Sequence, residues 1–382
     1  MEKETQRYMI FKLSDNIVSS LGFTTAANYK AVLEGKSGIT PGQDAAGNPL
    51  SISRIDAGKL DATFQDTFQA KEAYTVAEQA MLLSAHMAIQ EAGIDASSER
   101  TCFVLSSTKG NIHLLGLPSH GFGKDRVHLW HTAGLLAGFF GNPNVPVTVS
   151  NACISGACAQ IAAIHLLEQG NYDHVVVTGM DLAPDFIVSG FQSFKSLDQD
   201  RCRPFDARRK GLNLGEAAAT IVYGKEEKPG ISLVRGSIRN DANHISGPSR
   251  TGEGLFRALQ TAMEDLPAGN VAFISAHGTA TPYNDQMEAV AFSRAGLGST
   301  PVFSLKAHFG HTLGAAGVLE SVIALKALEQ GLVLPSTGFQ EPGIEGEINV
   351  STSLSKTDKR FCLKTLSGFG GCNAALLFQN AL

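Results

Sequence analysis

The sequence predicts an α/β fold made of two duplicated halves. In the first half, a buried strand over Val145–Ser150 leads through a turn into an almost wholly apolar helix over Ala157–Leu167. In the second half, a strand over Val302–Leu305 leads through a loop into an apolar helix over Ala315–Leu328. Both helices run into the same four letters, Leu-Glu-Gln-Gly. A shared order of strand, loop, buried helix and stop predicts an internal duplication.

The remaining segments fit the same fold class. Thr75–Ala92 has the periodicity of a helix, and Gly93 follows it as a stop signal. Val175–Gly179 and Val271–Ala276 read as strands with few polar residues, which is typical of strands covered by helices on both faces. Asn284–Ala295 is predicted to be the helix that follows the second of these strands.

Composition limits the classes of function. With 382 residues, 43% hydrophobic and 18% charged, the chain has the composition of a globular protein with a large core. The segment 224–230 is the most linker-like, so we predict an N-terminal half over 1–229 and a C-terminal half over 230–382. No run of about 18 apolar residues and no export signal is visible. A net charge of −5 argues against broad binding to nucleic acid. We therefore expect a cytoplasmic protein that binds neither nucleic acid nor membrane.

Cys153 is a candidate nucleophile. It stands between a predicted strand and the start of a buried helix, where unpaired backbone N–H groups and the helix dipole favour the thiolate. Taken alone, Cys153 is equally compatible with a buried structural cysteine, which is our interpretation of Cys158.

Two histidines stand in comparable loops. His277 directly follows a predicted strand, in the crevice position where α/β sheets bind ligands, and His311 occupies the loop of the second repeat. The spacing of His308 and His311 could also suggest a metal site. No carboxylate or cysteine completes it nearby, so we predict no metal.

One thiol and two imidazoles suggest carbon–carbon bond chemistry on thioesters. A cysteine thiolate can take an acyl group from a thioester and hold it covalently. If the second substrate is a malonyl-type thioester, loss of CO₂ leaves an enolate without any proton being removed from carbon. Two neutral imidazole N–H groups could then hold the enolate oxygen, each worth about 3 kcal/mol. Backbone N–H groups at Cys153 and near Phe369 could hold the tetrahedral intermediate of acyl transfer.

The motifs His277-Gly-Thr-x-Thr-Pro and Gly310-His-x-x-Gly-Ala-Ala-Gly complete the pattern. With Cys153 they resemble the β-ketoacyl-acyl carrier protein synthases of the condensing-enzyme family, of the Cys-His-His type. The likeness runs from the segment 33–39 to the C-terminal Gly-Phe369-Gly-Gly. The resemblance implies a thiolase-like layered fold (α-β-α-β-α). It also implies a decarboxylative Claisen condensation for fatty acid, polyene or polyketide synthesis. No resident cofactor is implied, because the pantetheine arm arrives on the acyl carrier protein.

The resemblance also implies roles for single residues. Cys153 would accept the acyl chain, and His277 and His311 would polarise the malonyl thioester. Lys306 would order the site electrostatically, held by Glu288. Further positions would line the site: the gating aromatic Phe369, the pantetheine contacts Thr279, Thr281 and Ser246, and the pocket residue Leu212.

Leu212 departs from the family pattern, because a phenylalanine commonly lines the acyl pocket at this position. Replacing Phe by Leu removes volume, so we expect the pocket to admit a wider or stiffer chain, such as a polyene. For Thr279 and Thr281, capping of the loop is the simpler interpretation.

The acyl carrier protein is the implied partner, and it is acidic in this family. The densest cationic cluster comprises Arg201, Arg203, Arg208, Arg209 and Lys210, with Lys71 as an outlier. A structural pair between Arg203 and Asp206, with the other side chains solvated, explains the cluster equally well. The family resemblance further implies a homodimer, and a heterodimer is also compatible.

Two other functions remain open. A degradative thiolase shares the fold but usually pairs one histidine with a second cysteine. A non-catalytic chain-length partner subunit of a heterodimeric ketosynthase typically lacks the nucleophile that Cys153 supplies here.

Overall fold

The computed structural model describes residues 9–116, 121–225 and 230–381. In these residues, eleven strands form one mixed sheet in the order β13-β11-β10-β15-β16-β9-β1-β8-β6-β4-β5. The strands of the first half are β1 (Ile10–Ser19), β4 (Thr101–Ser106), β5 (Val147–Val149), β6 (His174–Asp181) and β8 (Ala217–Gly224). Those of the second half are β9 (Ile231–Asn240), β10 (Val271–Ser275), β11 (Pro301–Phe303), β15 (Phe361–Gly368) and β16 (Cys372–Asn380), with β13 (Asn349–Val350) at the edge.

The two halves have the same topology. With the extra edge strand β13 left aside, each half has five strands. Numbered along the chain within each half, they run third, second, fourth, fifth and first from the outer edge inward. The halves join where Ile10 and Phe11 of β1 pair with β9. The predicted duplication is therefore confirmed.

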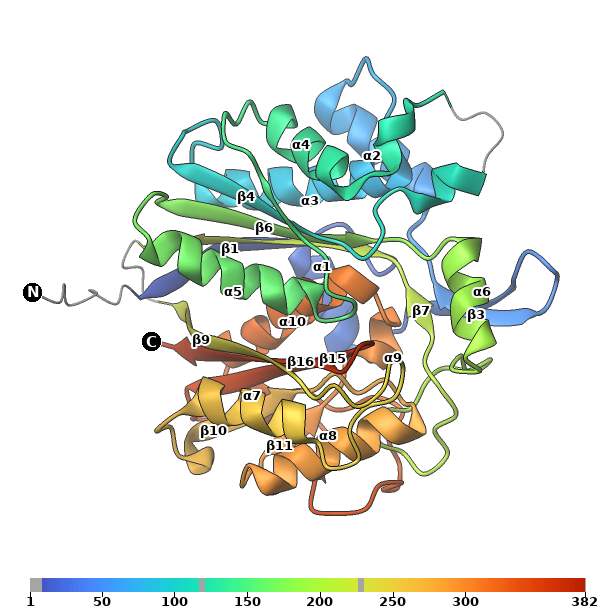
Figure 1. Ribbon diagram of the computed structural model, residues 1–382, viewed down its shortest axis with the longest axis vertical. Helices are drawn as coiled ribbons and strands as arrows, with labels where there is room; N and C mark the ends of the chain where they lie inside the picture. The colour runs from blue at the N-terminus through green and yellow to red at the C-terminus, as the bar shows by residue number, and fades with distance from the viewer. Residues whose placement is uncertain (1–8, 117–120, 226–229, 382) are drawn as a thin grey trace, which may run out of the picture.

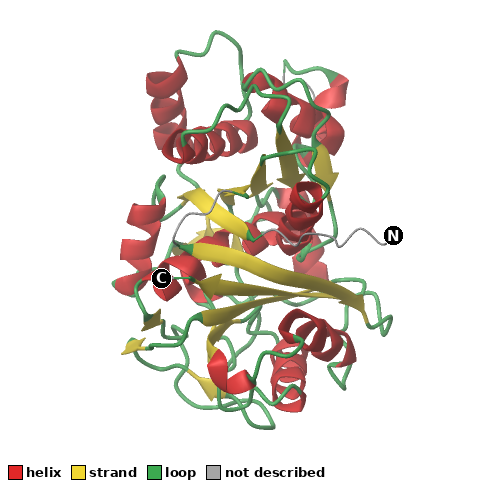
Figure 2. Ribbon diagram, turned by 90° about the vertical axis from the view of Figure 1, so that its left-hand side faces the viewer, coloured by secondary structure: helices red, strands yellow, loops and turns green. Residues whose placement is uncertain are grey.

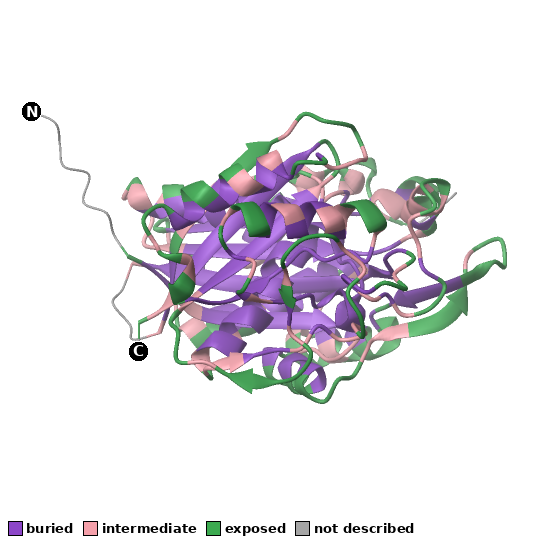
Figure 3. Cartoon of the chain, turned by 90° about the horizontal axis from the view of Figure 1, so that it is seen from below, coloured by how far each residue is buried: buried purple, intermediate pink, exposed green. Residues whose placement is uncertain are grey.

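Helices cover both halves in an α-β-α-β-α arrangement (Figures 1 and 2). One outer layer contains α2 (Ala57–Phe68), α3 (Val76–Ala92) and α4 (Leu129–Phe139), and the other contains α7 (Glu253–Met263) and α8 (Pro282–Arg294). The central layer contains α5 (Ser155–Glu168) and α10 (Ala316–Glu329), which contact each other and strands of both halves. Seen from below, the sheet and these central helices form the buried interior of the molecule (Figure 3).

Two glycines let the central helices touch. A Cβ on Gly156 of α5 would lie 2.9 Å from Cα of Gly317, and a Cβ on Gly317 would lie 2.5 Å from the nitrogen of Ala157. These distances are too short for any side chain. The contact joins the first turns of α5 and α10, so the loops that precede the two helices also meet.

The smaller elements lie around this framework. They are α1 (Thr25–Leu33), α6 (Asp185–Ser193), α9 (Lys306–Phe309), β2 (Ile39–Gln43), β3 (Pro49–Ser53), β7 (Leu214–Gly215), β12 (Leu332–Val333) and β14 (Ser355–Lys356), with short 3₁₀ turns at 112–116, 124–127, 268–270 and 313–315. Among the described residues, none of the helices combines the length and apolarity needed to cross a bilayer.

The predicted elements are present, with ends shifted by a few residues. The strand expected to be buried over Val145–Ser150 is instead the partly exposed edge strand β5, and Val145 lies outside it with an exposed side chain. Thr75 caps α3 through a capping box with Glu78, and Gly93 ends it with a left-handed φ of 68°. Of the predicted linker, residues 226–229 lie outside the described part of the chain. The domain boundary within it stays a prediction.

Candidate active site

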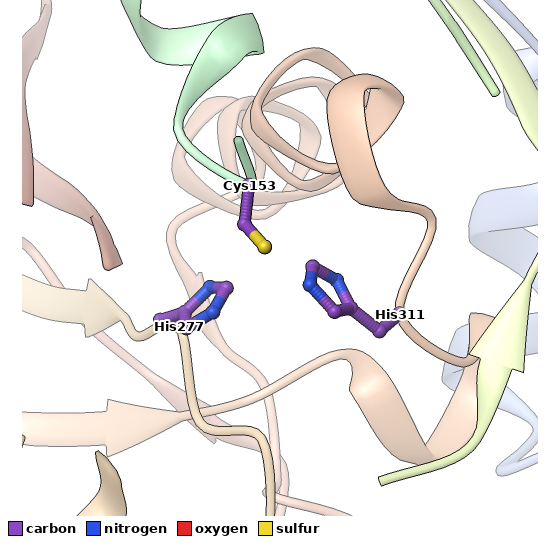
Figure 4. Close-up of side chains that lie close together, drawn as sticks. All are labelled: Cys153, His277 and His311. Carbon is purple, nitrogen blue, oxygen red and sulfur yellow. The ribbon is translucent and has the colours of Figure 1, made fainter. Parts of the chain in front are cut away.

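Cys153, His277 and His311 meet at one point (Figure 4). The Cys153 sulfur and a ring nitrogen of each histidine all lie within 4.8 Å of one another. Cys153 precedes α5, His277 follows β10, and His311 stands just before α10. The contact between α5 and α10 thus brings together residues far apart in the sequence.

The turn that presents Cys153 is fixed by its neighbours. Ala152 adopts a left-handed φ of 44°, which is strained for a residue with a Cβ. The Ser155 hydroxyl donates to the carbonyl of Ala152 (2.6 Å) and accepts from the N–H of Asn151 (2.8 Å). These bonds hold the sulfur at the end of a short loop rather than inside the helix.

The two imidazoles face each other edge to face, with ring centroids 5.2 Å apart and planes at 84°. Among the described residues, Nδ1 of neither ring has a hydrogen-bond partner. Burial lowers the pKa of both histidines well below its usual value, and the positive charge of Lys306 adds to the effect. Both rings are therefore neutral at pH 7, and each can donate one N–H.

Burial acts on the thiol in the opposite direction from the expected helix effect. It raises the pKa of Cys153 to about 12, while Lys306 and a hydrogen bond from the backbone of Phe369 oppose the rise. Desolvation therefore outweighs the expected effect of the helix start. Cys153 is a thiol at neutral pH.

Glu288 orients His277 through the backbone. Its carboxylate accepts the N–H groups of His277 (2.8 Å) and Gly278 (2.7 Å). Gly278 has a φ of 46°, and a Cβ there would lie 2.5 Å from Cβ of Ser304. The turn that ends in His277 therefore requires glycine at the next position.

The predicted pairing of Lys306 with Glu288 is wrong. The Lys306 ammonium donates to Glu320 (2.5 Å) and to the carbonyl of His277 (2.9 Å). Glu320 lies on α10, directly behind the site, whereas the carboxylate of Glu288 is occupied by backbone N–H groups. Both lysine and glutamate are buried, so the pair acts in a medium of low dielectric.

His308 does not join His311. Its ring nitrogens contact the carbonyl of Lys36 (2.6 Å) and the hydroxyl of Thr337 (2.9 Å). Both ring nitrogens of His308 are therefore occupied, which argues against a metal site that joins His308 and His311. The predicted absence of a metal stays a prediction.

Phe369 lies beside the nucleophile. Gly368 lets its turn approach, because a Cβ there would lie 3.1 Å from the nitrogen of Cys153. The Phe369 ring stacks on Phe191 at 5.8 Å and meets Phe194 edge-on at 5.3 Å. This aromatic group stands at the mouth of the site.

A cleft of about 520 Å³ leads to the three reactive side chains. Every predicted position for substrate contact or gating lines it: Leu212, Ser246, Thr279, Thr281 and Phe369. Glu288 and Lys306 stand behind the cleft and do not line it. The hydroxyls of Thr279 and Thr281 lie 2.8 Å apart, which also fits a role in shaping the loop.

The cationic cluster divides into buried and exposed members. Arg209 is structural, because it donates to the carbonyls of Asp206 and Pro282. Among the described residues, the side chain of Asp206 forms its ion pair with Arg208, at 3.7 Å between Oδ1 and Nε, and not with Arg203. Arg208 and Lys210 keep exposed side chains beside a surface hollow.

Two charged residues of the site, Glu320 and Lys364, were missed by the sequence analysis. Both are buried behind the histidines, where Lys364 Nζ lies 2.7 Å from Glu320 Oε2. A charged residue in an apolar helix and another in a buried strand were the available signals, since such residues are rarely buried unless they are paired.

Comparison with known proteins agrees with this geometry. Residues 17–228 match the model of the β-ketoacyl synthase N-terminal domain, and residues 231–340 match that of the C-terminal domain. The chain belongs to the β-ketoacyl synthase family. It is 27% identical over 414 residues to 3-oxoacyl-[acyl-carrier-protein] synthase 2 of Vibrio harveyi, covering 95% of this chain and 96% of that protein.

Two further relatives are more distant or partial. Nodulation protein E of Rhizobium meliloti is 32% identical over 248 residues, which covers 60% of this chain and 61% of that protein. Among solved structures, a ketosynthase (ApeO) in complex with its chain length factor (ApeC) from Xenorhabdus doucetiae aligns with a TM-score of 0.87 at 24% identity, over 100% of both chains. The alignment with this solved structure shows that the chain has the thiolase-like fold.

This β-ketoacyl synthase is therefore an acyl-transferring condensing enzyme. Neither a degradative thiolase nor a non-catalytic partner subunit is favoured by these relatives.

Proposed function

We propose that Cys153 carries the acyl chain and that His277 and His311 drive decarboxylation of a malonyl thioester, both substrates being delivered by an acyl carrier protein. The observation that supports this assignment most is the meeting of one sulfur and two neutral imidazoles in a single cleft. In the neutral state each ring keeps one N–H, which can donate to the enolate oxygen.

In the first step, the Cys153 sulfur attacks the acyl thioester. The new bond is S–C(acyl), the bond to the pantetheine sulfur breaks, and the proton lost by Cys153 ends on the departing pantetheine thiol. The N–H groups of Cys153 and Phe369 flank the sulfur and are suited to hold the tetrahedral oxyanion.

In the second step, the malonyl thioester loses CO₂ and its carbonyl oxygen takes up negative charge. His277 and His311 donate to this oxygen. The enolate carbon then attacks the acyl carbonyl carbon, and the bond from that carbon to the Cys153 sulfur breaks. The sulfur leaves as a thiolate and takes up a proton from solvent. The product is a β-ketoacyl thioester on the carrier.

The cleft suits a pantetheine arm. It is long, mostly apolar, and bears the hydroxyls of Ser246, Thr279 and Thr281 along its walls. Because the arm arrives on the carrier, the reaction needs no resident cofactor or metal. Arg208 and Lys210 would attract the acidic carrier to the mouth.

The enzyme is proposed to act in the cytoplasm as a dimer. A solved neighbour pairs a ketosynthase with a chain length factor, which supports a non-identical partner here, whereas the family resemblance implies an identical one. Native mass spectrometry of the purified chain distinguishes these states.

Mass spectrometry after incubation with defined acyl-carrier proteins tests the assignment. We expect an acyl adduct on the peptide that contains Cys153, and release of CO₂ once malonyl-carrier is added. An adduct on another cysteine, or none with any acyl chain, would refute the role of Cys153. Cys158 serves as the internal control, because it is buried five positions further on in α5.

A further inference from the structure

Lys364 binds the end of the strand that carries His277. It lies on β15 with a fully buried side chain, and its ammonium donates to the carbonyls of Ser275 (3.0 Å), Ala276 (3.1 Å) and Thr365 (2.9 Å). An ammonium has three N–H donors. All three are therefore used on backbone carbonyls, two of which directly precede His277.

Glu320 shares its charge between two lysines. One oxygen accepts from Lys306 at 2.5 Å, and the other lies 2.7 Å from Lys364 Nζ. Among the described residues, this second oxygen accepts no hydrogen bond. The contact of Lys364 with Glu320 is thus one of charge, while its hydrogen bonds hold the backbone.

The segment around His277 is clamped from both sides. The carbonyls of residues 275–277 all accept from a buried ammonium, that of Lys364 or of Lys306. The N–H groups of residues 277 and 278 both donate to Glu288. No freedom remains for this backbone to rotate without breaking a buried, charge-assisted bond, and such bonds are among the strongest in proteins.

We propose that Lys364 is a positioning residue for His277: it fixes the end of β10 and balances Glu320, so that the imidazole stays neutral and aimed at the substrate oxygen. The proposal rests on the function proposed above. Two lysines and two glutamates, Lys306, Lys364, Glu288 and Glu320, thus offset one another in formal charge. After desolvation, the positive charges of Lys306 and Lys364 help to keep the pKa of His277 low.

Other titratable groups lie near this cluster. Cys153 stands in the turn before α5, and Asp285 of α8 accepts from the backbone of Phe205 and Ala280. On the side of His311, Lys109 pairs with Asp181 at 3.1 Å, and the charge of Lys109 adds to the burial that lowers the pKa of His311. The four buried groups Lys306, Lys364, Glu288 and Glu320 therefore dominate the charge around His277.

The test compares Lys364→Met with Lys12→Met. Lys12 is a matched control, because it is also a buried lysine paired with a glutamate of α10: its Nζ lies 2.8 Å from Glu329 and 2.6 Å from Asp15, at the far end of that helix. Both variants lose a buried ion pair, but only one loses the clamp on His277. Loading of Cys153 and decarboxylation of malonyl-carrier are measured separately across pH, with the melting temperature of each variant.

We expect Lys364→Met to slow decarboxylation by about 10²-fold, since a small displacement of a catalytic group costs this much. Loading of Cys153 should change by less than about 3-fold, because a displaced His277 affects only the step in which it takes part. The acid limb of the decarboxylation profile should move to higher pH, because an unbalanced carboxylate favours protonated imidazole. Lys12→Met should lower the melting temperature only.

The double variant Lys364→Met/Glu320→Gln removes the hydrogen bonds of Lys364 to the backbone without changing the net charge around His277. It also replaces the single variant if Lys364→Met does not fold. With the net charge restored to zero, its acid limb should return to the wild-type position while its rate stays low. Decarboxylation by both Lys364 variants at the rate of Lys12→Met, with an unchanged profile, would overturn the role of Lys364. Failure of the wild-type enzyme to load or decarboxylate would instead refute the proposed function.

Discussion

The carboxylate of Glu320 lies 2.5 Å from the ammonium of Lys306, and both groups are buried. Glu320 also neutralises Lys364 from its other oxygen. One glutamate on α10 therefore holds two cations behind the histidines. The family resemblance had implied only that Glu288 would hold Lys306. The site depends on this carboxylate for its charge balance.

Replacing Glu320 by Leu should destabilise the protein by about 3–5 kcal/mol, because it leaves buried ammonium groups without a counter-charge. Urea denaturation followed by circular dichroism measures the free energy of unfolding. Glu34→Leu, at an exposed pair with Lys36, should leave it nearly unchanged, because solvent screens such a pair. Equal losses in the two variants would contradict the structural role of Glu320.

His311→Ala should slow decarboxylation of malonyl-carrier by about 10²–10³-fold, the usual cost of one oxyanion donor. Acyl loading of Cys153 should persist, because its proposed oxyanion donors are backbone N–H groups. Rapid-quench assays with ¹⁴C-labelled malonyl-carrier separate the two steps. Loss of loading by a similar factor would show that His311 acts on the first step instead.

Stability should fall as the pH decreases from 6.5, because several histidines are buried in the neutral form. Burial lowers the pKa of His308 from 6.5 to about 4. Between these values the unfolded chain binds a proton that the folded chain does not, so the free energy of unfolding rises with pH.

His308→Gln should reduce that slope by about 1.4 kcal/mol per pH unit between pH 4 and 6.5. Urea titrations at several pH values provide the measurement. An unaltered slope in His308→Gln would mean that His308 is protonated in the fold.

Leu212→Phe should narrow the acyl end of the cleft, because Leu212 is buried and lines it. We expect loading of wide or stiff chains, such as polyenes, to fall by at least about 10-fold relative to short saturated chains. A small change of volume in an apolar pocket alters selectivity by about 10- to 200-fold. Competition between paired acyl-carrier substrates measures the ratio. Preference for saturated chains in the wild-type enzyme would count against a wide pocket.

Reversing the charges of Arg208 and Lys210 to Glu should raise KM for carrier-bound substrates while leaving kcat unchanged. Small thioester analogues without a carrier should react as before. Reversal of Lys30 and Lys36, both exposed and outside the cleft, is the matched control. Equal losses on carrier-bound and small substrates would refute docking at this surface.

The sequence predicted the parts of the fold that local patterns determine. Apolar runs gave β10 and α10, and the repeated stop signal gave the duplication, because both follow from burial between layers. It could not give the glycine contact between α5 and α10, since nothing local to Gly156 indicates which residue lies opposite it.

Side-chain partners in the site were harder to predict than its reactive residues. Cys153 and the histidines stand at strand and helix ends, which sequence motifs reveal. Glu320 was missed because its partners Lys306 and Lys364 reach it only through the folded core. The pKa of Cys153 was misjudged for a related reason: the helix start is visible in the sequence, but the depth of burial is not.

Release of CO₂ from malonyl-carrier by acyl-loaded enzyme tests the central claim most directly. The wild-type enzyme with its acyl chain on Cys153 should release CO₂ in a single turnover, whereas the acyl-loaded His277→Ala/His311→Ala variant should release almost none. Equal release by both enzymes would contradict the account, because the two imidazoles would then take no part in forming the enolate.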